Sequence, residues 1–152
     1  MPYRVLDDGQ VQYYPDVQVK GLQEIYNFES ISAEAEVMTA EKQLQSVHPT
    51  LKRMLENDAY NTYCVDCKIN LSECCSLNFG IFICHPCALE HQKLLGAGIS
   101  FLKSLASAEW DDYLLRFMLY GGNKLFYEFL NRYKLDGKPL VDKYKHVALQ
   151  WY

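Results

Sequence analysis

Hydrophobic residues follow helical spacing over most of this 152-residue chain. Besides a helix that ends at Gly96, the pattern predicts five helices, separated by turn-forming glycines and prolines, and we expect Asn123 to cap the fourth of these five. In the first two helices, over 33–46 and ending near Asn57, the residues expected to face inward are Val37, Ala40, Leu44 and Val47, and then Leu51, Met54 and Leu55. In the third helix they are Trp110, Leu114, Phe117 and Met118, and in the fourth they are Leu125, Phe126, Phe129, Leu130 and Tyr133. In the last helix they are Leu140, Tyr144, Val147, Ala148 and Trp151.

Two stretches alternate instead between apolar and polar positions, as half-buried strands do. In residues 1–20 the alternation lies on both sides of Asp7-Asp8-Gly9-Gln10, whose Asp-Gly pair predicts a hairpin. Residues 76–83 predict a single strand, and a helix ending at Gly96 follows it. We therefore expect a mainly α fold with a small β element. The residues expected on one face of the strand are Leu77, Phe79, Ile81 and Ile83.

Four of the six cysteines form two C-x2-C pairs, and sixteen residues separate the pairs. They are Cys64, Cys67, Cys84 and Cys87. This spacing lets two tight turns offer four thiolates to one tetrahedral Zn²⁺. The alternatives are buried free thiols or a redox C-x-x-C, but the redox motif needs a βαβ context that this stretch lacks. Because all four positions are ligands, the predicted Zn²⁺ is structural and stabilises the fold.

The remaining cysteines and histidines are not expected to bind metal. Cys74 and Cys75 have no C-x2-C partner and are interpreted as small buried residues. His85 and His91 are expected at the surface or in contact with the ligands rather than on the metal. His48 precedes a proline and is interpreted as a loop residue.

Charge and composition exclude several classes of protein. The net charge is −4, with −5 in residues 1–60 and +1 in residues 61–152, so neither part has the basic excess that nucleic acid selects. A DNA-binding finger of similar spacing is also disfavoured, since Lys68 is the only base between the two pairs. The sequence contains no run of eighteen apolar residues, so it predicts no membrane span. The start of the sequence has no apolar signal segment, so we expect an intracellular protein, cytoplasmic by default, with an organellar assembly, mitochondrial included, left open.

The cysteine region resembles the zinc finger of the ArfGAP domains, which stimulate GTP hydrolysis by Arf-type small GTPases. The resemblance covers about residues 48–152, and it implies a four-cysteine finger packed against helices, with one structural Zn²⁺ and an Arf-type GTPase as partner. The residues that match the family's motifs are Ser76, Asn78 and Gly80, Phe82-Ile83-Cys84, His91, Leu95-Gly96, Ile99-Ser100, Ser104-Leu105, Trp110, Gly122-Asn123 and Lys143-Tyr144.

One departure from the family bears directly on activity. The resemblance implies an arginine five positions after the last zinc cysteine, where it stabilises charge on the transferring phosphoryl group, but this chain has Gln92 there. Loss of such an arginine is expected to remove about 10³–10⁵ of rate. From this we predict a non-catalytic module, a pseudoenzyme with no catalytic residue that serves as a structural or interaction subunit. The alternative is an active GTPase-activating protein. Other departures are Cys74 for a tryptophan, Gly98 for a histidine, and Phe101, Leu102 and Lys103 in a basic stretch.

The predicted domain boundary divides residues 1–47, an extended arm plus a helix, from the zinc-finger domain at 48–152. The arm is acidic and rich in tyrosine, a residue favoured where one end of a ring is buried and the other meets water. We therefore predict that the arm docks on other protein subunits through Tyr3, Tyr13 and Tyr14. The alternative is that it packs on its own domain.

Overall fold

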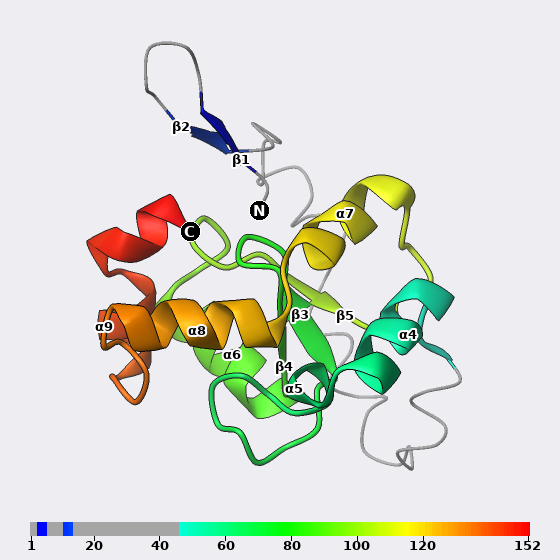
Figure 1. Ribbon diagram of the computed structural model, residues 1–152. Coiled ribbons are helices and arrows are strands. Elements are labelled where there is room, and N and C mark those ends of the chain that lie inside the picture. The colour runs from blue at the N-terminus through cyan, green and yellow to red at the C-terminus, as the bar shows by residue number, and fades with distance from the viewer. Residues whose placement is uncertain (1–2, 6–10, 14–45) are drawn as a thin grey trace.

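The computed structural model describes residues 3–5, 11–13 and 46–152 (Figure 1). In 46–152, helices surround a small antiparallel sheet, which confirms the expected mainly α fold with a small β element. The elements are β1 (Tyr3–Val5), β2 (Val11–Tyr13), α4 (Pro49–Asn57), α5 (Ala59–Thr62), β3 (Cys74–Ser76), β4 (Ile81–Ile83), α6 (His85–Leu94), β5 (Leu102–Ser104), α7 (Asp112–Tyr120), α8 (Asn123–Arg132), α9 (Leu140–Tyr144) and the 3₁₀ helix η2 (Val147–Trp151).

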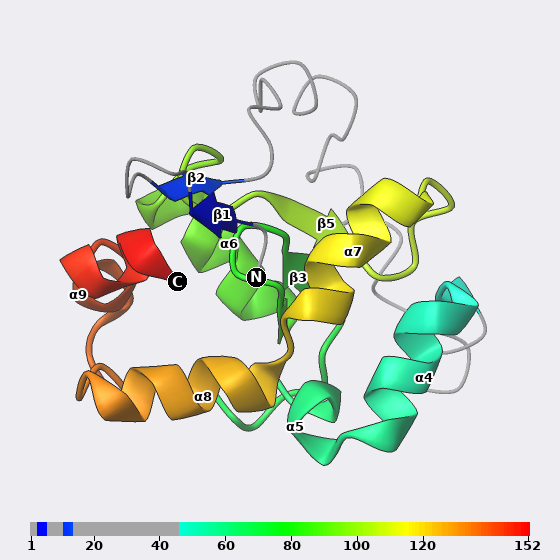
Figure 2. The same ribbon diagram turned by 45° about the horizontal axis from the view of Figure 1, so that its top comes forward.

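The sheet has the order β4-β3-β5 and lies in the middle of the domain, between α8 and α9 on one side and α4 and α7 on the other (Figures 1 and 2). The single strand predicted over 76–83 is wrong. The chain turns at residues 77–80, where Gly80 has a left-handed φ of 60°, and β3, which ends at Ser76, pairs antiparallel with β4, which begins at Ile81. Strand β5 was not predicted, because three residues are too few to establish a period.

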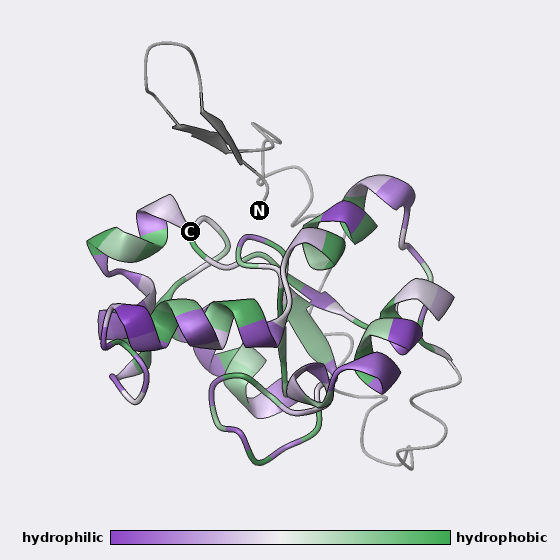
Figure 3. Ribbon diagram, viewed as in Figure 1, coloured by the Kyte–Doolittle hydropathy of each residue, from purple (hydrophilic) through white to green (hydrophobic). Residues whose placement is uncertain are grey.

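Both faces of β4 are buried, which a half-buried strand would not show. Ile81 and Ile83 belong to one hydrophobic cluster with Phe126, Leu130 and Tyr144. Phe82 points to the other face and belongs to a second cluster, and all three β4 side chains have zero exposure. Burying each side chain of this size contributes about 1.5–3 kcal/mol. Figure 3 shows the result as hydrophobic colour on β3 and β4. The second cluster includes Leu51, Cys75, Phe82, Trp110, Leu114 and Met118.

The helices predicted from apolar spacing are present wherever the structure describes them, but some inward faces were assigned too widely. Phe126 and Leu130 of α8 are fully buried, whereas Leu125 is 52% exposed and Tyr133 is 49% exposed. In Figure 3, α8 accordingly alternates between hydrophobic and hydrophilic colour along its length. The last predicted helix is divided, since α9 ends at Tyr144 and the chain continues as η2 in a new direction. Helical spacing counted from α9 therefore fails for two residues, Val147 and Trp151, each 60% exposed.

Residues before the domain are only partly described. β1 and β2 pair antiparallel with Tyr3 opposite Tyr13, which confirms the predicted hairpin. Its turn, Tyr14 and the helix predicted over 33–46, apart from Ser46, lie outside the described residues, so the docking role of the arm stays a prediction. His48 precedes α4, where its Nδ1 accepts a hydrogen bond from the Thr50 amide at 3.2 Å. Within the described part of the chain, every helix is too short or too polar to cross a membrane.

Candidate metal centre

The structure brings the two cysteine pairs together. The Sγ atoms of Cys64, Cys67, Cys84 and Cys87 all lie within 4.8 Å of one another, and the Cys67 and Cys84 sulfurs are 3.8 Å apart. Zn–S bonds of about 2.3 Å in a tetrahedron place sulfurs about 3.8 Å apart. None of these four cysteines is in a disulfide. Four soft sulfur donors at this separation fit Zn²⁺.

The first pair is shaped by a tight turn. The Lys68 amide donates to the Cys64 carbonyl at 2.9 Å, and Lys68 adopts a left-handed φ of 59° to close the turn. The Asn70 side chain lies beside the metal site, with its Nδ2 donating to Cys84 Sγ at 3.6 Å. N–H donors directed at sulfur stabilise the thiolate form.

The second pair is formed by the start of α6. Cys84 is the N-cap residue, and its carbonyl accepts from the Ala88 amide at 3.0 Å. Cys87 therefore lies in the first turn, at the positive end of the helix dipole. This placement favours negative charge on its sulfur, and it fixes the second pair to the element that also carries His91 and Gln92.

The four thiols compete for protons when only protein groups surround them. A hydrogen bond from Cys87 lowers the pKa of Cys64 to about 5. The same contact raises the pKa of Cys87, and burial raises that of Cys84 to about 11. Cys64 therefore carries the negative charge while Cys84 and Cys87 keep their protons. A divalent cation removes this competition, because it stabilises several thiolates together.

A buried polar network supports the first turn. His91 has zero exposure, so the prediction that it lies at the surface is wrong, and the expected contact with the metal region is made through Asp66. Its Nε2 lies 2.8 Å from Asp66 Oδ2, and its Nδ1 lies 2.8 Å from Ser100 Oγ, which is 2.7 Å from Ser76 Oγ. His91 is thus held by its neighbours and is not among the four clustered metal-binding side chains.

Asp66 is the residue that sequence reasoning missed. It lies between Cys64 and Cys67 and also accepts hydrogen bonds from Lys143 Nζ at 3.0 Å and Tyr144 Oη at 2.8 Å. Burial alone would raise the pKa of Asp66, but the His91 hydrogen bond and the charges of His91 and Lys143 together lower it. The carboxylate therefore stays ionised and ties the metal loop to α6 and α9. An acidic residue inside a C-x2-C pair was the available signal.

The family is decided by comparison with known proteins. The ArfGap family model, described as "Putative GTPase activating protein for Arf", matches residues 49–150. The chain belongs to the ArfGap family. This confirms the resemblance drawn from the cysteine region and the motifs around it. The division at residues 47 and 48 stays a prediction, because residues 14–45 are not described.

Relatives and solved structures agree with the ArfGap assignment. "ADP-ribosylation factor GTPase-activating protein 3" of Bos taurus is 30% identical over 104 residues, 68% of this chain and 20% of that protein. "Arf-GAP with dual PH domain-containing protein 2" of Homo sapiens is 37% identical over 76 residues, 47% of this chain and 19% of that protein. The chain thus spans about a fifth of the length of these relatives.

Two solved structures are similar to this one. The first, described as a "putative GTPase activating protein for ADP ribosylation factor from Cryptosporidium parvum", has a TM-score of 0.52 and 26% identity, over 69% of this chain and 85% of that chain. The "ArfGap domain of HIV-1 Rev binding protein" has a TM-score of 0.51 and 18% identity, over 80% of this chain and 85% of that chain. The second comparison shows the ArfGap fold alone.

The prediction of a non-catalytic module is corrected by these comparisons. The family and the relatives are named as GTPase-activating proteins, and none of the findings supports a pseudoenzyme or a structural subunit. The prediction depended on Gln92, whereas the ArfGap match covers the whole domain. One substituted side chain on the surface of one helix is weaker evidence about function than a family match over the whole domain, because the match shows that the scaffold presenting that surface is retained.

The position that the resemblance assigns to the arginine is well defined in this ArfGap structure. α6 directs Ala88 and His91 into the core, and Gln92 is exposed on the outer side. Lys93 follows it and is also exposed. Because His91 is locked by Asp66 and Ser100, the rotation of α6 is fixed, and Gln92 projects from a rigid helix.

Asn123 has a different role from the one predicted. Gly122 is the N-cap of α8, and Asn123 is buried inside the first turn at 1% exposure. Its Nδ2 lies 2.9 to 3.0 Å from the carbonyl oxygens of Tyr60, Tyr63 and Phe82, and its Oδ1 accepts from the Phe82 amide at 2.8 Å. This side chain therefore joins α8 to β4 and to the segment that leads into the first cysteine pair.

Proposed function

We propose that this ArfGap domain binds an Arf-type small GTPase and stimulates its hydrolysis of GTP. The single observation that carries the proposal is the family match over residues 49–150, which includes both cysteine pairs, the sheet and the helices that position them. The names of the relatives, ADP-ribosylation factor GTPase-activating proteins among them, support the same substrate class.

The metal that we propose is one structural Zn²⁺ per chain. Cys64, Cys67, Cys84 and Cys87 would hold it as thiolates, and with four protein ligands it would supply folding energy and no open coordination position. Asn70 would donate to the ligand sulfurs from outside the centre. The work of this centre is to fix the start of α6, and so to position the exposed face of that helix.

Gln92 is the residue of α6 that we assign to the transferring phosphoryl group. Its carboxamide can donate a hydrogen bond to a phosphoryl oxygen, but it carries no charge. A charged arginine at such a position contributes about 10³–10⁵ in rate, so the stimulation expected from Gln92 is smaller. Docking of the two proteins would raise the rate of GTP hydrolysis separately. It would hold the GTPase's own residues and the attacking water in place, and such positioning lowers the activation barrier.

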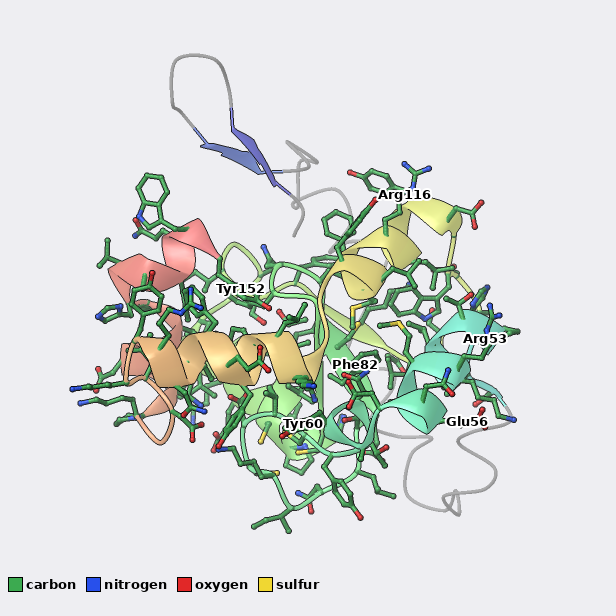
Figure 4. The ribbon with its side chains drawn as sticks, in the orientation of Figure 1. Arg53, Glu56, Tyr60, Phe82, Arg116 and Tyr152 are labelled. Atoms are coloured by element: carbon green, nitrogen blue, oxygen red, sulfur yellow. The ribbon has the colours of Figure 1, made fainter. Side chains whose placement is uncertain are left out.

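A single-turnover assay tests this proposal. An Arf-type GTPase loaded with γ-labelled GTP is mixed with increasing concentrations of this chain, and phosphate release is followed. We expect the hydrolysis rate to rise with concentration and to reach a plateau as the complex saturates. A rate that stays at the intrinsic value while binding to the GTPase is complete would overturn the proposal. Arg53→Gln is the control for loss of a surface charge and should reach the same plateau as the unmodified chain, because Arg53 is exposed on α4, away from α6 (Figure 4).

A further inference from the structure

Positive charge is concentrated at one end of the sequence. Residues 131–152 contain five Lys or Arg and two Asp, a net charge of +3 in a chain whose net charge is −4. Lys143 and Asp136 are already paired, since Lys143 contacts the buried Asp66 at 3.0 Å and Asp136 forms a surface ion pair with Lys68 at 2.7 Å. What remains exposed is four bases and one acid. The exposed charged residues are Arg132, Lys134, Lys138 and Lys145, with Asp142.

The same stretch exposes two large apolar side chains. Val147 and Trp151 of η2 are each 60% exposed. η2 itself is firmly anchored, because Ala148 and Leu149 are buried in the first hydrophobic cluster beside the end residue, Tyr152. Tryptophan and valine thus project from a fixed base, with basic residues preceding them in the chain.

These residues belong to one end of the molecule. The C-terminal end of α8, the following turn, α9 and η2 lie together, and α4 and α7 lie at the opposite end (Figures 1 and 2). Arg53 and Arg116, labelled in Figure 4, project from that opposite end. The surface formed by Arg132, Lys134, Lys138, Lys145, Val147 and Trp151 is called the basic end below.

We propose that the basic end docks on the surface of an anionic phospholipid membrane. The lysines and Arg132 would lie over the lipid phosphates, and Trp151 and Val147 would enter the headgroup region, where amphipathic aromatic rings are favoured. The composition distinguishes this partner from an acidic protein. Lysine is depleted from protein interfaces, and three of the four exposed bases are lysines, whereas exposed lysines combined with an exposed tryptophan are typical of interfacial membrane binding.

Vesicle co-sedimentation of the full chain provides the first test. We expect binding to vesicles of phosphatidylcholine with a quarter phosphatidylserine, weak binding to phosphatidylcholine alone, and a decrease in binding as salt rises. Each basic residue contributes about fivefold in affinity, so the triple variant Lys134→Gln, Lys138→Gln, Lys145→Gln should bind about a hundredfold more weakly. The double variant Arg53→Gln, Arg116→Gln is the control, and should lose little affinity. Equal losses in the two variants would overturn the proposal.

Tryptophan fluorescence provides a second test that does not depend on affinity. The chain has two tryptophans, and Trp110 is buried, with its Nε1 donating to the Ser104 carbonyl at 3.2 Å. A blue shift on adding anionic vesicles should therefore come from Trp151 and disappear in Trp151→Phe. A shift that persists in that variant would contradict the proposal. Binding to soluble poly-glutamate as tightly as to vesicles, with no shift on vesicles, would indicate an acidic protein partner instead. GTP hydrolysis assayed without vesicles is independent of both outcomes.

Discussion

Lys143 and Asp66 meet at 3.0 Å in the interior of the domain, although 77 positions separate them in the chain. Their contact joins α9, near the end of the sequence, to the loop between the first two cysteines. The carboxylate also accepts from His91 and Tyr144, so one buried anion organises three elements. A buried charge of this kind is tolerated because each of its oxygens has donors.

The first prediction concerns that ion pair. Lys143→Met removes the lysine charge that pairs with Asp66, and removing one partner of a buried pair costs about 3–5 kcal/mol. We expect the free energy of unfolding, measured by urea denaturation of the zinc-loaded protein, to fall by that amount. Lys145→Met is the matched control, because Lys145 is exposed, and should change stability by less than about 0.5 kcal/mol. Similar losses in both variants would show that the buried contact is not what stabilises the loop.

Asn123 carries the second prediction. Asn123→Ala leaves the Phe82 amide and three carbonyl groups without this partner, and each buried group left unsatisfied costs about 1–3 kcal/mol. We expect a loss of at least about 2 kcal/mol in the free energy of unfolding. Asn131→Ala, at an exposed position on the same helix, should be close to neutral. If Asn123→Ala is as stable as the unmodified chain, the side chain does not hold α8 to β4.

The parts of this site that could be predicted from the sequence are those set by residues close together in the chain. The four cysteines were identifiable because each pair lies within one turn, and the spacing between pairs is a property of the sequence alone. Gln92 was identified by its position five residues after Cys87, and the structure shows that its side chain is exposed. His91, by contrast, was expected at the surface or in contact with the ligands, and its burial depends on Asp66 and Ser100, which are 25 and 9 positions away.

The fold shows the same division. Helices α4, α7 and α8 were predictable because apolar spacing within about ten residues sets which side is buried. The strand over 76–83 was misjudged because Gly80 turns the chain and because clusters on both faces bury β4. Trp151 was placed inward by counting along a helix that in fact ends at Tyr144. Where chain direction changes, periodicity from the preceding element no longer applies.

Alkaline pH should reveal the buried thiol of Cys75. Burial raises its pKa to about 12, so the folded state keeps the proton while an unfolded chain releases it above about pH 9. Stability from this group is therefore lost as pH rises above the unfolded value, at about 1.4 kcal/mol per pH unit. Between pH 9 and 10.5, we expect the unmodified chain to lose about 2 kcal/mol more than Cys75→Ala. Parallel pH profiles for the two proteins would contradict this assignment.

Removal of metal should unfold the domain around the cysteine pairs. We expect metal analysis to find one zinc per folded chain, and we expect a strong chelator or Cys67→Ser to abolish the cooperative unfolding transition. Cys74→Ser is the control for thiol loss, since Cys74 is buried outside the four-cysteine cluster, and it should keep the zinc. A folded chain with much less than one zinc, or with a disulfide between the pairs, would be incompatible with a zinc centre.

The rate of GTP hydrolysis in a saturated complex with an Arf-type GTPase tests the central claim most directly. With the unmodified chain, Gln92→Arg and Gln92→Ala compared at saturation, we predict stimulation by all three, in the order arginine, glutamine, alanine, because a guanidinium neutralises charge that a carboxamide only hydrogen-bonds. The binding constants should stay similar, since the substituted side chain acts on the transition state. A saturated complex of the unmodified chain that hydrolyses GTP no faster than the GTPase alone would contradict the account.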